Sequence, residues 1–266
     1  MVFRKSKTNA VYFLVIAVSL ILTLTLSSCS PQETALSGVE VLDGDTLRVS
    51  GQSFRIVGID APEVHEGDKP VGEYGQDAKN YLYWFASNFE LSYEQKGKDS
   101  YGRILVYLFG KDRQTDAKYL YEASLTENGY ARPLIYDSTS VPNYTKAIVD
   151  AYKRAYENRR GIFSKYDNAP VIDKTKASQL SSYKGKIVWL EMDVNNVIFS
   201  NDTYYVYSDF ALVKIRSGEY NNLFNGYNLY GLKGRKVRFY GELWYDSYEG
   251  KYMIMLRAPF EIKIVN

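Results

Sequence analysis

The sequence predicts a mainly β, α+β protein in which two β-rich blocks follow one another along the chain. Short segments of alternating apolar and polar residues, bounded by Gly, Asp and Ser turns, recur from residue 39 onward. Amphipathic stretches with three- and four-residue spacing occur in the first block. A polar stretch with little periodicity, residues 168–182, separates the two blocks. The length of 266 residues is sufficient for two domains.

The first block begins with a meander of strands. Three strands are expected, each alternating and each bounded by a turn, at residues 39–42, 46–49 and 54–59. Asp45 begins the second of them, and Asp60 ends the third, just before Pro62. Adjacent strands lie about 4.8 Å apart, so the two carboxylates can share one cation. Two carboxylates with a backbone carbonyl and waters suit calcium rather than zinc.

Three helices are expected in the first block. The first has an apolar stripe of Tyr74, Ala78, Tyr81, Leu82, Phe85 and Phe89. The second covers residues 118–128, with Gly129 as its stop signal. The third has a stripe of Ala147, Ile148, Ala151, Tyr152 and Ala155 and ends at Gly161. Strands that are interrupted and followed by such helices suit an OB-type barrel with about three packed helices.

Charged residues at the strand ends and turns of this block fit the hydrolysis of a phosphodiester. Glu63 is the candidate general base, because a carboxylate can deprotonate or orient the attacking water. Arg55 and Arg103 can each hold a phosphate through two nitrogens, which Lys cannot do. A divalent ion bound by Asp45 and Asp60 would polarise a phosphate oxygen. Each motif alone is common in structural turns, so their ordered combination is what favours a catalytic site.

The block contains, in order, Asp43-Gly44-Asp45-Thr46, Phe54-Arg55, Asp60-Ala61-Pro62-Glu63 and Tyr101-Gly102-Arg103. This order and spacing resemble the thermonuclease family, the micrococcal-nuclease-like proteins, over about residues 37–164. The resemblance implies a nuclease-type OB barrel, calcium as cofactor, DNA and RNA as substrates, and 3′-phosphate products. It implies the following roles: metal ligands Asp45, Asp60 and the backbone carbonyl of Ala61; general base Glu63; phosphate clamps Arg55 and Arg103.

Three positions near these motifs need separate comment. The family often has Thr where this chain has Ala61, but a backbone carbonyl ligand survives that change. The family's nucleotide-stacking tyrosines do not align cleanly near Tyr136, so none is assigned. His65 is the one histidine of the chain, which excludes nuclease chemistries that need paired or metal-bound histidines. It is expected to be a loop residue near the mouth of the site.

The N-terminus has the features of a leader. Three basic residues precede a nearly all-apolar run, residues 11–26, and the only cysteine of the chain follows in Leu26-Ser27-Ser28-Cys29. This ending resembles the bacterial lipobox, which implies a signal peptide at residues 1–28 and a lipid on Cys29. Residues 29–37 would be the tether of an exported lipoprotein, anchored in the cell envelope or at the cell surface of a bacterium. An uncleaved membrane helix is the alternative, because the run approaches spanning length.

The charge balance depends on this leader. Its three basic residues are not matched by acidic ones, so the rest of the chain has 30 basic and 31 acidic residues and a net charge of −1. Binding of DNA or RNA then depends on local patches and a bound metal. The membrane is contacted through the lipid, and neither a protein partner nor an oligomeric state is indicated.

A linker, residues 168–182, is expected between a nuclease-like domain at 38–167 and a second block at 183–266. The strands of the second block are expected at residues 186–192, 203–207, 211–215, 236–243, 251–256 and 260–264, with a possible short helix at 220–230. This order resembles small OB-like modules of exported bacterial proteins, which implies a second, smaller OB-like β-barrel.

The second block is rich in aromatic and basic residues that can contact nucleic acid. The aromatic candidates are Tyr204, Tyr205, Tyr207, Tyr240, Trp244, Tyr245 and Tyr248, and the basic candidates are Lys233, Arg235, Lys236 and Arg238. A purely structural role is the alternative, because Tyr favours strands. Two rival functions apply to the whole chain: a catalytically silent nuclease-like fold that binds nucleic acid or protein, and a surface adhesion protein.

Overall fold

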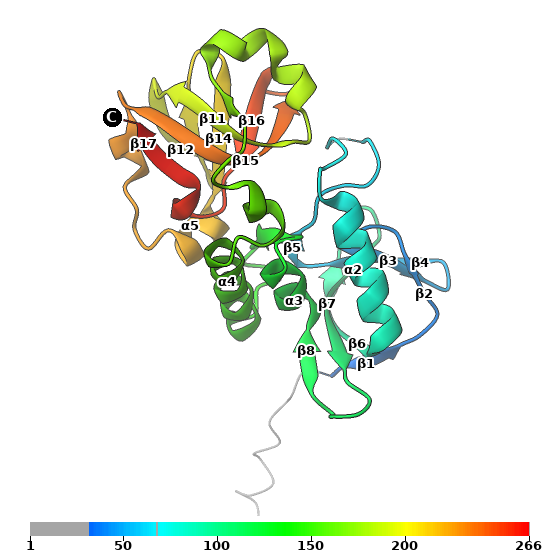
Figure 1. Ribbon diagram of the computed structural model, residues 1–266. Helices are drawn as coiled ribbons and strands as arrows, with labels where there is room; N and C mark the ends of the chain where they lie inside the picture. Colours follow the sequence, from blue (N-terminus) through cyan, green and yellow to red (C-terminus); the bar gives the residue numbers. More distant parts are fainter. Residues whose placement is uncertain (1–31, 68, 266) are drawn as a thin grey trace, which may run out of the picture. The chain divides into compact units, whose positions relative to one another are not determined.

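The computed structural model describes residues 32–67 and 69–265 (Figure 1). The described residues from Thr34 onward form one compact unit. The expected signal peptide and the expected lipid site, Cys29, lie outside the described residues. Within the described part of the chain, no helix is both long enough and apolar enough to cross a membrane.

A seven-stranded sheet forms the first half of the compact unit. Its strands are β1 (Thr34–Leu36), β2 (Val39–Val41), β3 (Thr46–Val49), β4 (Gln52–Ile56), β6 (Glu90–Lys98), β7 (Ile104–Lys111) and β8 (Lys118–Leu120). They pair in the order β1-β6-β7-β4-β3-β2, with β8 beside β7. Only Ser37 and Gly38 separate β1 from β2, although these strands lie at opposite ends of that order. The sheet is therefore strongly curled, and its two ends are joined by one short stretch of chain.

The expected strand 54–59 is wrong, because the chain bends between two sheets. β4 ends at Ile56, and β5 (Gly58–Asp60) pairs instead with β9 (Arg132–Leu134). Gly58 has a φ of +81°, and a Cβ there would lie 2.9 Å from Cδ1 of Ile148. Both the positive φ and the lack of space for a Cβ favour glycine at this position. The bend places Arg55 and Asp60 on different strands rather than on one.

Three helices accompany the first sheet: α2 (Gly75–Asn88), α3 (Tyr121–Glu127) and α4 (Pro142–Glu157). The expected apolar stripe of α2 is confirmed, since Ala78, Leu82 and Phe85 are all buried in the core of this sheet. The expected helix at 118–128 is only partly correct, because its first turn is the strand β8. Lys118 to Leu120 pair with β7, so the ladder of that strand overrides local helix propensity.

An eight-stranded sheet forms the second half of the unit. Its strands are β10 (Val171–Ile172), β11 (Ile187–Asp193), β12 (Asn196–Ser200), β13 (Thr203–Tyr207), β14 (Ala211–Arg216), β15 (Lys236–Asp246), β16 (Lys251–Met255) and β17 (Ile262–Val265). They pair in the order β10-β11-β15-β16-β14-β13-β12, with β17 beside β15. The helices are η1 (Gly161–Lys165), η2 (Lys174–Tyr183), α5 (Ser217–Leu223), η3 (Leu229–Leu232) and η4 (Pro259–Glu261).

Several segments differ from the sequence-based expectation. Residues 168–182, expected as a linker, contain β10 and most of η2, and Leu180 is buried in the core of the second sheet. Thr34 to Leu36, expected in the tether, form β1 and pair with β6. The helix expected at 220–230 begins at Ser217 and ends at Leu223. In each case the segment is held by pairing or packing that involves residues distant in the sequence.

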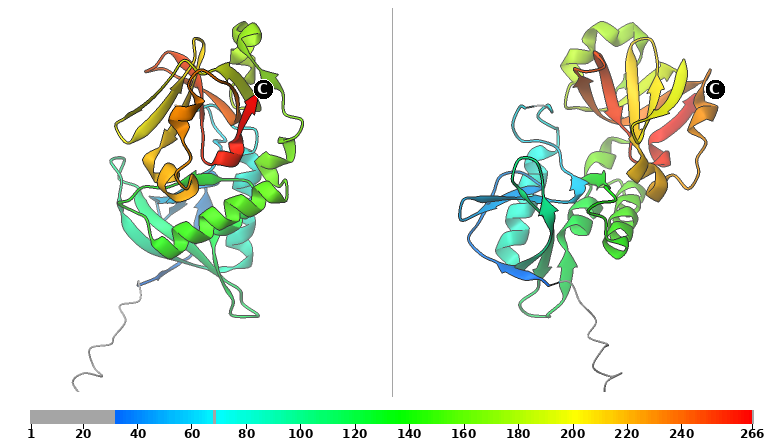
Figure 2. Two further views of the ribbon diagram at one scale, coloured as in Figure 1. Left: turned by 90° about the vertical axis from the view of Figure 1, so that its left-hand side faces the viewer. Right: turned by 180° about the vertical axis from the view of Figure 1, so that it is seen from behind.

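A third hydrophobic cluster joins the two halves. Figure 2 shows the ribbon of the two halves from two further sides. Its buried members are Tyr152, Ala155, Ile162, Phe163, Tyr166 and Ala169 from the first part of the chain, and Ile187, Trp189, Tyr240 and Ala258 from the second. The Trp189 indole donates to the carbonyl of Tyr166 over 2.8 Å, and the Tyr240 hydroxyl donates to the carbonyl of Ile162. Buried aromatic side chains remove roughly 150–250 Å² each from water, so this cluster stabilises both halves together.

Candidate active site

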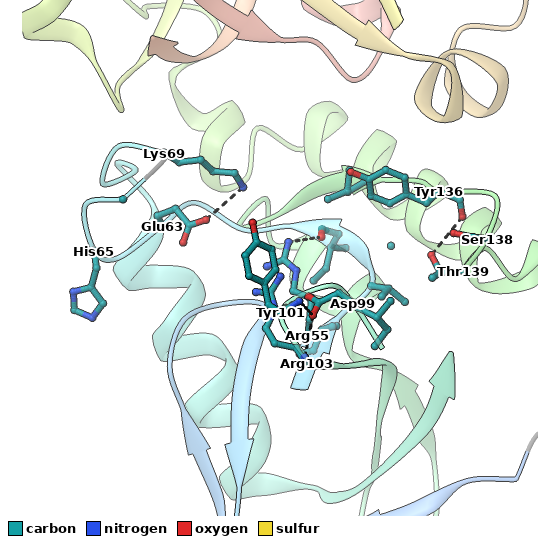
Figure 3. Close-up of a pocket in the computed structure, with 17 residues that line it drawn as sticks. Arg55, Glu63, His65, Lys69, Asp99, Tyr101, Arg103, Tyr136, Ser138 and Thr139 are labelled. Atoms are coloured by element: carbon teal, nitrogen blue, oxygen red, sulfur yellow. Dashed lines mark hydrogen bonds and ion pairs between the residues drawn. The ribbon is translucent and has the colours of Figure 1, made fainter. Parts of the chain in front are cut away.

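A pocket with a volume of about 810 Å³ lies beside the paired strands β4 and β7 of the first sheet (Figure 3). It is lined by the β4–β5 bend, the loop after β5, the turn before β7 and the segment after β9. Six of its polar lining residues carry the argument below: Arg55, Glu63, Lys69, Asp99, Arg103 and Tyr136. The sequence-predicted base and both predicted clamps therefore line one cavity.

One guanidinium joins the two aspartates that were predicted to hold a metal. Arg55 forms a close ion pair with Asp45 through one nitrogen, and its other nitrogen lies 3.5 Å from Oδ1 of Asp60. The side chains of Asp45 and Asp60 are 3% and 6% exposed, so this cluster is shielded from water. Two carboxylates that contact the same guanidinium are close enough to share one cationic partner.

The turn that carries Asp45 is fixed by contacts on both sides. Oδ2 of Asp45 accepts a 2.7 Å hydrogen bond from the backbone N–H of Ala61, and the Tyr121 hydroxyl donates to the carbonyl of Gly44 over 2.7 Å. A Cβ at Gly44 would lie 2.5 Å from Cβ of Ala78 on α2. Only glycine allows this approach, so the Asp-Gly-Asp turn sits against the helix for a steric reason.

Three cations surround Asp60. Lys69 Nζ lies 2.5 Å from Oδ1, the Arg257 guanidinium lies 2.9 Å from Oδ2, and Arg55 completes the set. Burial alone would raise the pKa of Asp60, but these three charges outweigh it and hold the pKa well below its usual range. Asp60 is therefore an ionised carboxylate at neutral pH.

Glu63 lies between this cluster and solvent. Its side chain is about one-third exposed, and Oε1 lies 3.4 Å from Nζ of Lys69. Its backbone is fixed, because the carbonyl of Glu63 accepts from the N–H of Gly72 over 2.9 Å. A Cβ at Gly75, the first residue of α2, would lie 2.3 Å from that same carbonyl oxygen. The carboxylate can reach a water in the pocket while its backbone stays in place.

Arg103 is held by Asp99 in the turn before β7. Oδ2 of Asp99 lies 2.7 Å from Nε of Arg103, and Oδ1 accepts the backbone N–H groups of Tyr101 and Arg103. These hydrogen bonds outweigh burial and lower the pKa of Asp99. The ring of Tyr101, which is 81% exposed, lies 5.5 Å from the guanidinium carbon of Arg103. The Tyr-Gly-Arg turn therefore presents an oriented cation and an exposed ring at the pocket.

Comparison with known proteins gives a consistent result. Residues 53–165 match the sequence profile of a family described as Staphylococcal nuclease homologue. The Thermonuclease of Staphylococcus hyicus is 32% identical over 135 residues, which are 47% of this chain and 73% of that protein. The chain belongs to the staphylococcal nuclease family. The Thermonuclease of Staphylococcus intermedius is also similar, at 28% identity over 175 residues, 60% of this chain and 99% of that protein.

The acidic residues beside the pocket suit a hard cation. Asp45 and Asp60 supply carboxylate oxygens, and both already contact a shared positive group, Arg55. Among the described residues no cluster of three or more Asp, Glu, His or Cys side chains is placed to hold a metal. A cation at this position would therefore combine the two carboxylates with neutral oxygens such as a backbone carbonyl and water, which is the donor set that calcium accepts.

Sequence reasoning missed several residues of the pocket. Lys69 and Asp99 lie among other charged residues in polar stretches, and no local pattern distinguishes them. Tyr136 was left unassigned, yet it lines the pocket and is about half exposed. Arg257 could not be predicted, because it approaches Asp60 from 197 residues further along the chain. His65 also lines the pocket, as expected for a loop residue at its mouth.

The aromatic and basic candidates of the second sheet do not form one surface. Tyr240 is fully buried, so it cannot stack on a base, and Tyr204 packs between Phe199 and Tyr220. Arg238 is paired with Glu191 over 2.6 Å within the same sheet. By contrast Tyr248 is 93% exposed. The core and internal ion pairs account for several of the side chains that suggested a stacking platform.

Proposed function

We propose that this chain is a calcium-dependent endonuclease that hydrolyses phosphodiester bonds of DNA and RNA and leaves 3′-phosphate ends. The observation that carries the proposal is the convergence of Arg55, Glu63 and Arg103 on one cavity beside the buried pair Asp45 and Asp60. Membership of a family that includes the two thermonucleases supports it. In such a reaction water attacks phosphorus, and the 5′ oxygen leaves.

Each side chain has a role that its position supports. Glu63 accepts the proton of the attacking water, because its carboxylate faces the cavity from a fixed backbone. Arg103 and Arg55 bind the phosphate oxygens and stabilise the charge that develops on them. Asp99 holds the guanidinium of Arg103 in place. Arg must serve here rather than Lys, because a planar guanidinium can hold two oxygens at once.

Calcium would be held by Asp45, Asp60 and the backbone carbonyl of Ala61. When bound, it supplies positive charge that polarises a non-bridging phosphate oxygen. Lys69 lies on Oδ1 of Asp60 and is partly exposed, so its ammonium is the group that must move aside. In the meantime Arg55 is paired with Asp45, and Arg257 is paired with Asp60.

The test uses the chain from Ser30 onward, purified without a lipid. It should digest plasmid DNA, single-stranded DNA and RNA in the presence of calcium, and a calcium chelator should abolish the activity. End analysis should find 3′-phosphates. No digestion of any of these substrates by a folded, calcium-supplied protein would refute the proposal.

A second candidate, a catalytically silent module that binds nucleic acid, is favoured by one observation. Asp60 already has three cationic neighbours, which oppose a further cation at that carboxylate. A silent module predicts DNA binding that calcium does not change and no cleavage. A calcium titration that produces cleavage decides against it.

We also propose an exported lipoprotein with its lipid on Cys29, a signal peptide at 1–28 and a tether from Cys29 to the start of β1 at Thr34, followed by a nuclease region that extends to about residue 167. The support is the basic start, the apolar run and the lipobox-like ending. Cys29→Ala should block incorporation of labelled fatty acid in bacteria and leave the leader attached. A mature N-terminus at another residue would refute this assignment.

We further propose that both sheets are OB-type barrels. The five strands are β2, β3, β4, β6 and β7 in the first sheet, and β12, β13, β14, β15 and β16 in the second. Numbered one to five along the chain, they pair in the order 1-2-3-5-4 in both sheets. The third and fifth strands are parallel, β4 with β7 and β14 with β16. In each, a helix follows the third strand before the fourth. The OB fold is a five-stranded Greek-key barrel with this arrangement.

A further inference from the structure

Two arginines of the second sheet lie side by side at the edge that meets the pocket. β14 and β16 are parallel neighbours, with Ala211 opposite Tyr252 and Lys214 opposite Met255. Continuing that register by two residues places Arg216, the last residue of β14, opposite Arg257, which follows β16. Parallel strands end at the same edge of a sheet, so both guanidinium groups extend toward the nuclease region.

Arg257 is the more deeply buried of the two. Its side chain is 1% exposed, and its NH2 lies 2.9 Å from Oδ2 of Asp60. Its NH1 lies 3.4 Å from Oε1 of Glu219, which is fully buried. Its backbone N–H donates to Glu261 over 2.6 Å. A buried guanidinium needs ionic partners. Among the described carboxylates, the guanidinium of Arg257 is paired with two, Asp60 and Glu219.

The same network reaches the wall of the pocket by a second path. Oε1 of Glu219 accepts from the backbone N–H of Ile135 over 2.9 Å. The next residue, Tyr136, lines the pocket, and Arg216 donates to its hydroxyl. The second sheet thus contacts both a carboxylate beside the pocket, Asp60, and an aromatic residue of its wall, Tyr136.

We propose that Arg257 is a positioning residue for Asp60, and that the second sheet is therefore part of the catalytic unit rather than an accessory to it. The proposal rests on the nuclease function proposed above. Arg257 fixes Oδ2 of Asp60, whereas Oδ1 faces Lys69, whose side chain is 28% exposed. Oδ1 is then the oxygen that can exchange an ammonium for a metal cation, and Arg257 prevents the carboxylate from turning away.

A purely structural role for Arg257 makes a different prediction. In that case its loss lowers thermal stability but leaves the metal site of the folded protein unchanged. Positioning predicts weaker metal binding and slower turnover in protein that is still folded. If Arg257 instead mainly repels the bound cation, its loss would tighten calcium binding. Calcium affinity therefore distinguishes a structural role, a positioning role and charge repulsion.

The experiment compares Arg257→Gln and Arg257→Lys with the wild-type chain from Ser30 onward. Calcium binding is measured by calorimetry without substrate, and kcat and KM are measured on single-stranded DNA. Residues that orient a metal ligand typically contribute about 10- to 100-fold to metal affinity or activity. Arg257→Gln should weaken calcium binding and lower kcat by about that factor, with KM changed by less than about threefold. Arg257→Lys should recover part of the calcium affinity and part of kcat, because Lys keeps the positive charge but lacks the planar guanidinium with its several N–H donors.

The matched control is Arg238→Gln. Arg238 belongs to the same sheet and has an ion pair of its own with Glu191, but it does not line the pocket. Its calcium affinity and kcat should equal those of the wild type. If Arg257→Gln does not fold, Arg257→Lys alone decides. Unchanged or tighter calcium binding in a folded Arg257 variant would overturn the proposal. A wild type that binds calcium but cleaves nothing would refute the nuclease function and leave the binding comparison intact.

Discussion

The two sheets share one pairing order, but the segments that follow their third strands, β4 and β14, differ. After β4 the chain bends at Gly58 and continues through β5 to Asp60 and Glu63 before reaching α2. After β14 it enters α5 directly, and Arg216 and Glu219 occupy the exit. The exit of the first sheet therefore carries the carboxylates for which we propose roles in catalysis and metal binding. The exit of the second carries a guanidinium and a buried acid that support the first.

On the proposals above, the same topology serves in the first sheet as an active site and in the second as the support of that site. The bend after β4 exposes functional groups to a cavity of about 810 Å³. The helix after β14 closes the corresponding position, and Gly218 in that helix packs directly on the carbonyl of Ile135. The predictions below test how far the two halves depend on each other, in order of decreasing effect.

Removal of the second half should have the largest effect. A chain that ends at residue 167 exposes Tyr152, Ile162 and Phe163, which are buried against the second half. Several large apolar side chains at about 25 cal/mol per Å² amount to a substantial part of a typical net stability of about 5–15 kcal/mol. We expect no cooperative unfolding transition in circular dichroism and no cleavage of DNA. Co-expression of residues 168–266 should restore both, and a folded, active fragment would contradict the shared core.

Glu63→Gln should leave the fold intact and lower kcat by about 100- to 10,000-fold, because it removes the general base without removing volume. Steady-state kinetics on single-stranded DNA measure the effect. Glu66→Gln is the control, since Glu66 is 77% exposed and lies three residues further on the same loop. Near wild-type turnover by Glu63→Gln would show that another group accepts the proton.

Arg103→Lys should lower kcat by about 100- to 1,000-fold, because Lys keeps the charge but cannot hold two phosphate oxygens. The effect is expected to be smaller than that of Glu63→Gln, since Asp99 can still hold the ammonium near the pocket. Arg113→Lys, at a largely exposed position, is the matched control. Equal turnover by Arg103→Lys and the control would exclude a bidentate role.

Glu242→Gln should have the smallest effect, and it should depend on pH. Glu242 is buried where the two halves meet, and burial raises its pKa to about 7. The folded state binds this proton more tightly than the unfolded state does, so its contribution to stability is present below about pH 4.5 and is lost as the pH rises to about 7. The free energy of unfolding falls by about 3 kcal/mol over this pH range, because a shift of one pKa unit corresponds to about 1.4 kcal/mol.

Glu242→Gln removes this dependence, because the amide does not titrate. The variant should therefore be more stable than the wild type at pH 8 and similar at pH 5, as measured by urea unfolding at both values. Glu40→Gln, at an exposed position of β2, should show no such difference. An equal stability change at both pH values would contradict the raised pKa.

The sequence allowed prediction where the determining signals are local. The stripe of α2, the Asp-Gly-Asp turn and the Tyr-Gly-Arg turn depend on residues within a few positions of one another, and the structure has all three. The bend at Gly58 was not predictable, because a single glycine within an apolar run is compatible with an uninterrupted strand. Arg257 was not predictable either, because no pattern in its own segment refers to Asp60.

The separation of 197 residues along the chain between Asp60 and Arg257 also determines the order in which the site is completed during synthesis. A ribosome that adds about 5–20 residues per second makes Arg257 roughly 10–40 s after Asp60. On the proposal above, a nascent chain has already produced its base and both clamps by Arg103, yet its metal ligand still lacks the guanidinium that orients it. An enzyme that digests nucleic acid would then become competent only after the ribosome has passed Arg257.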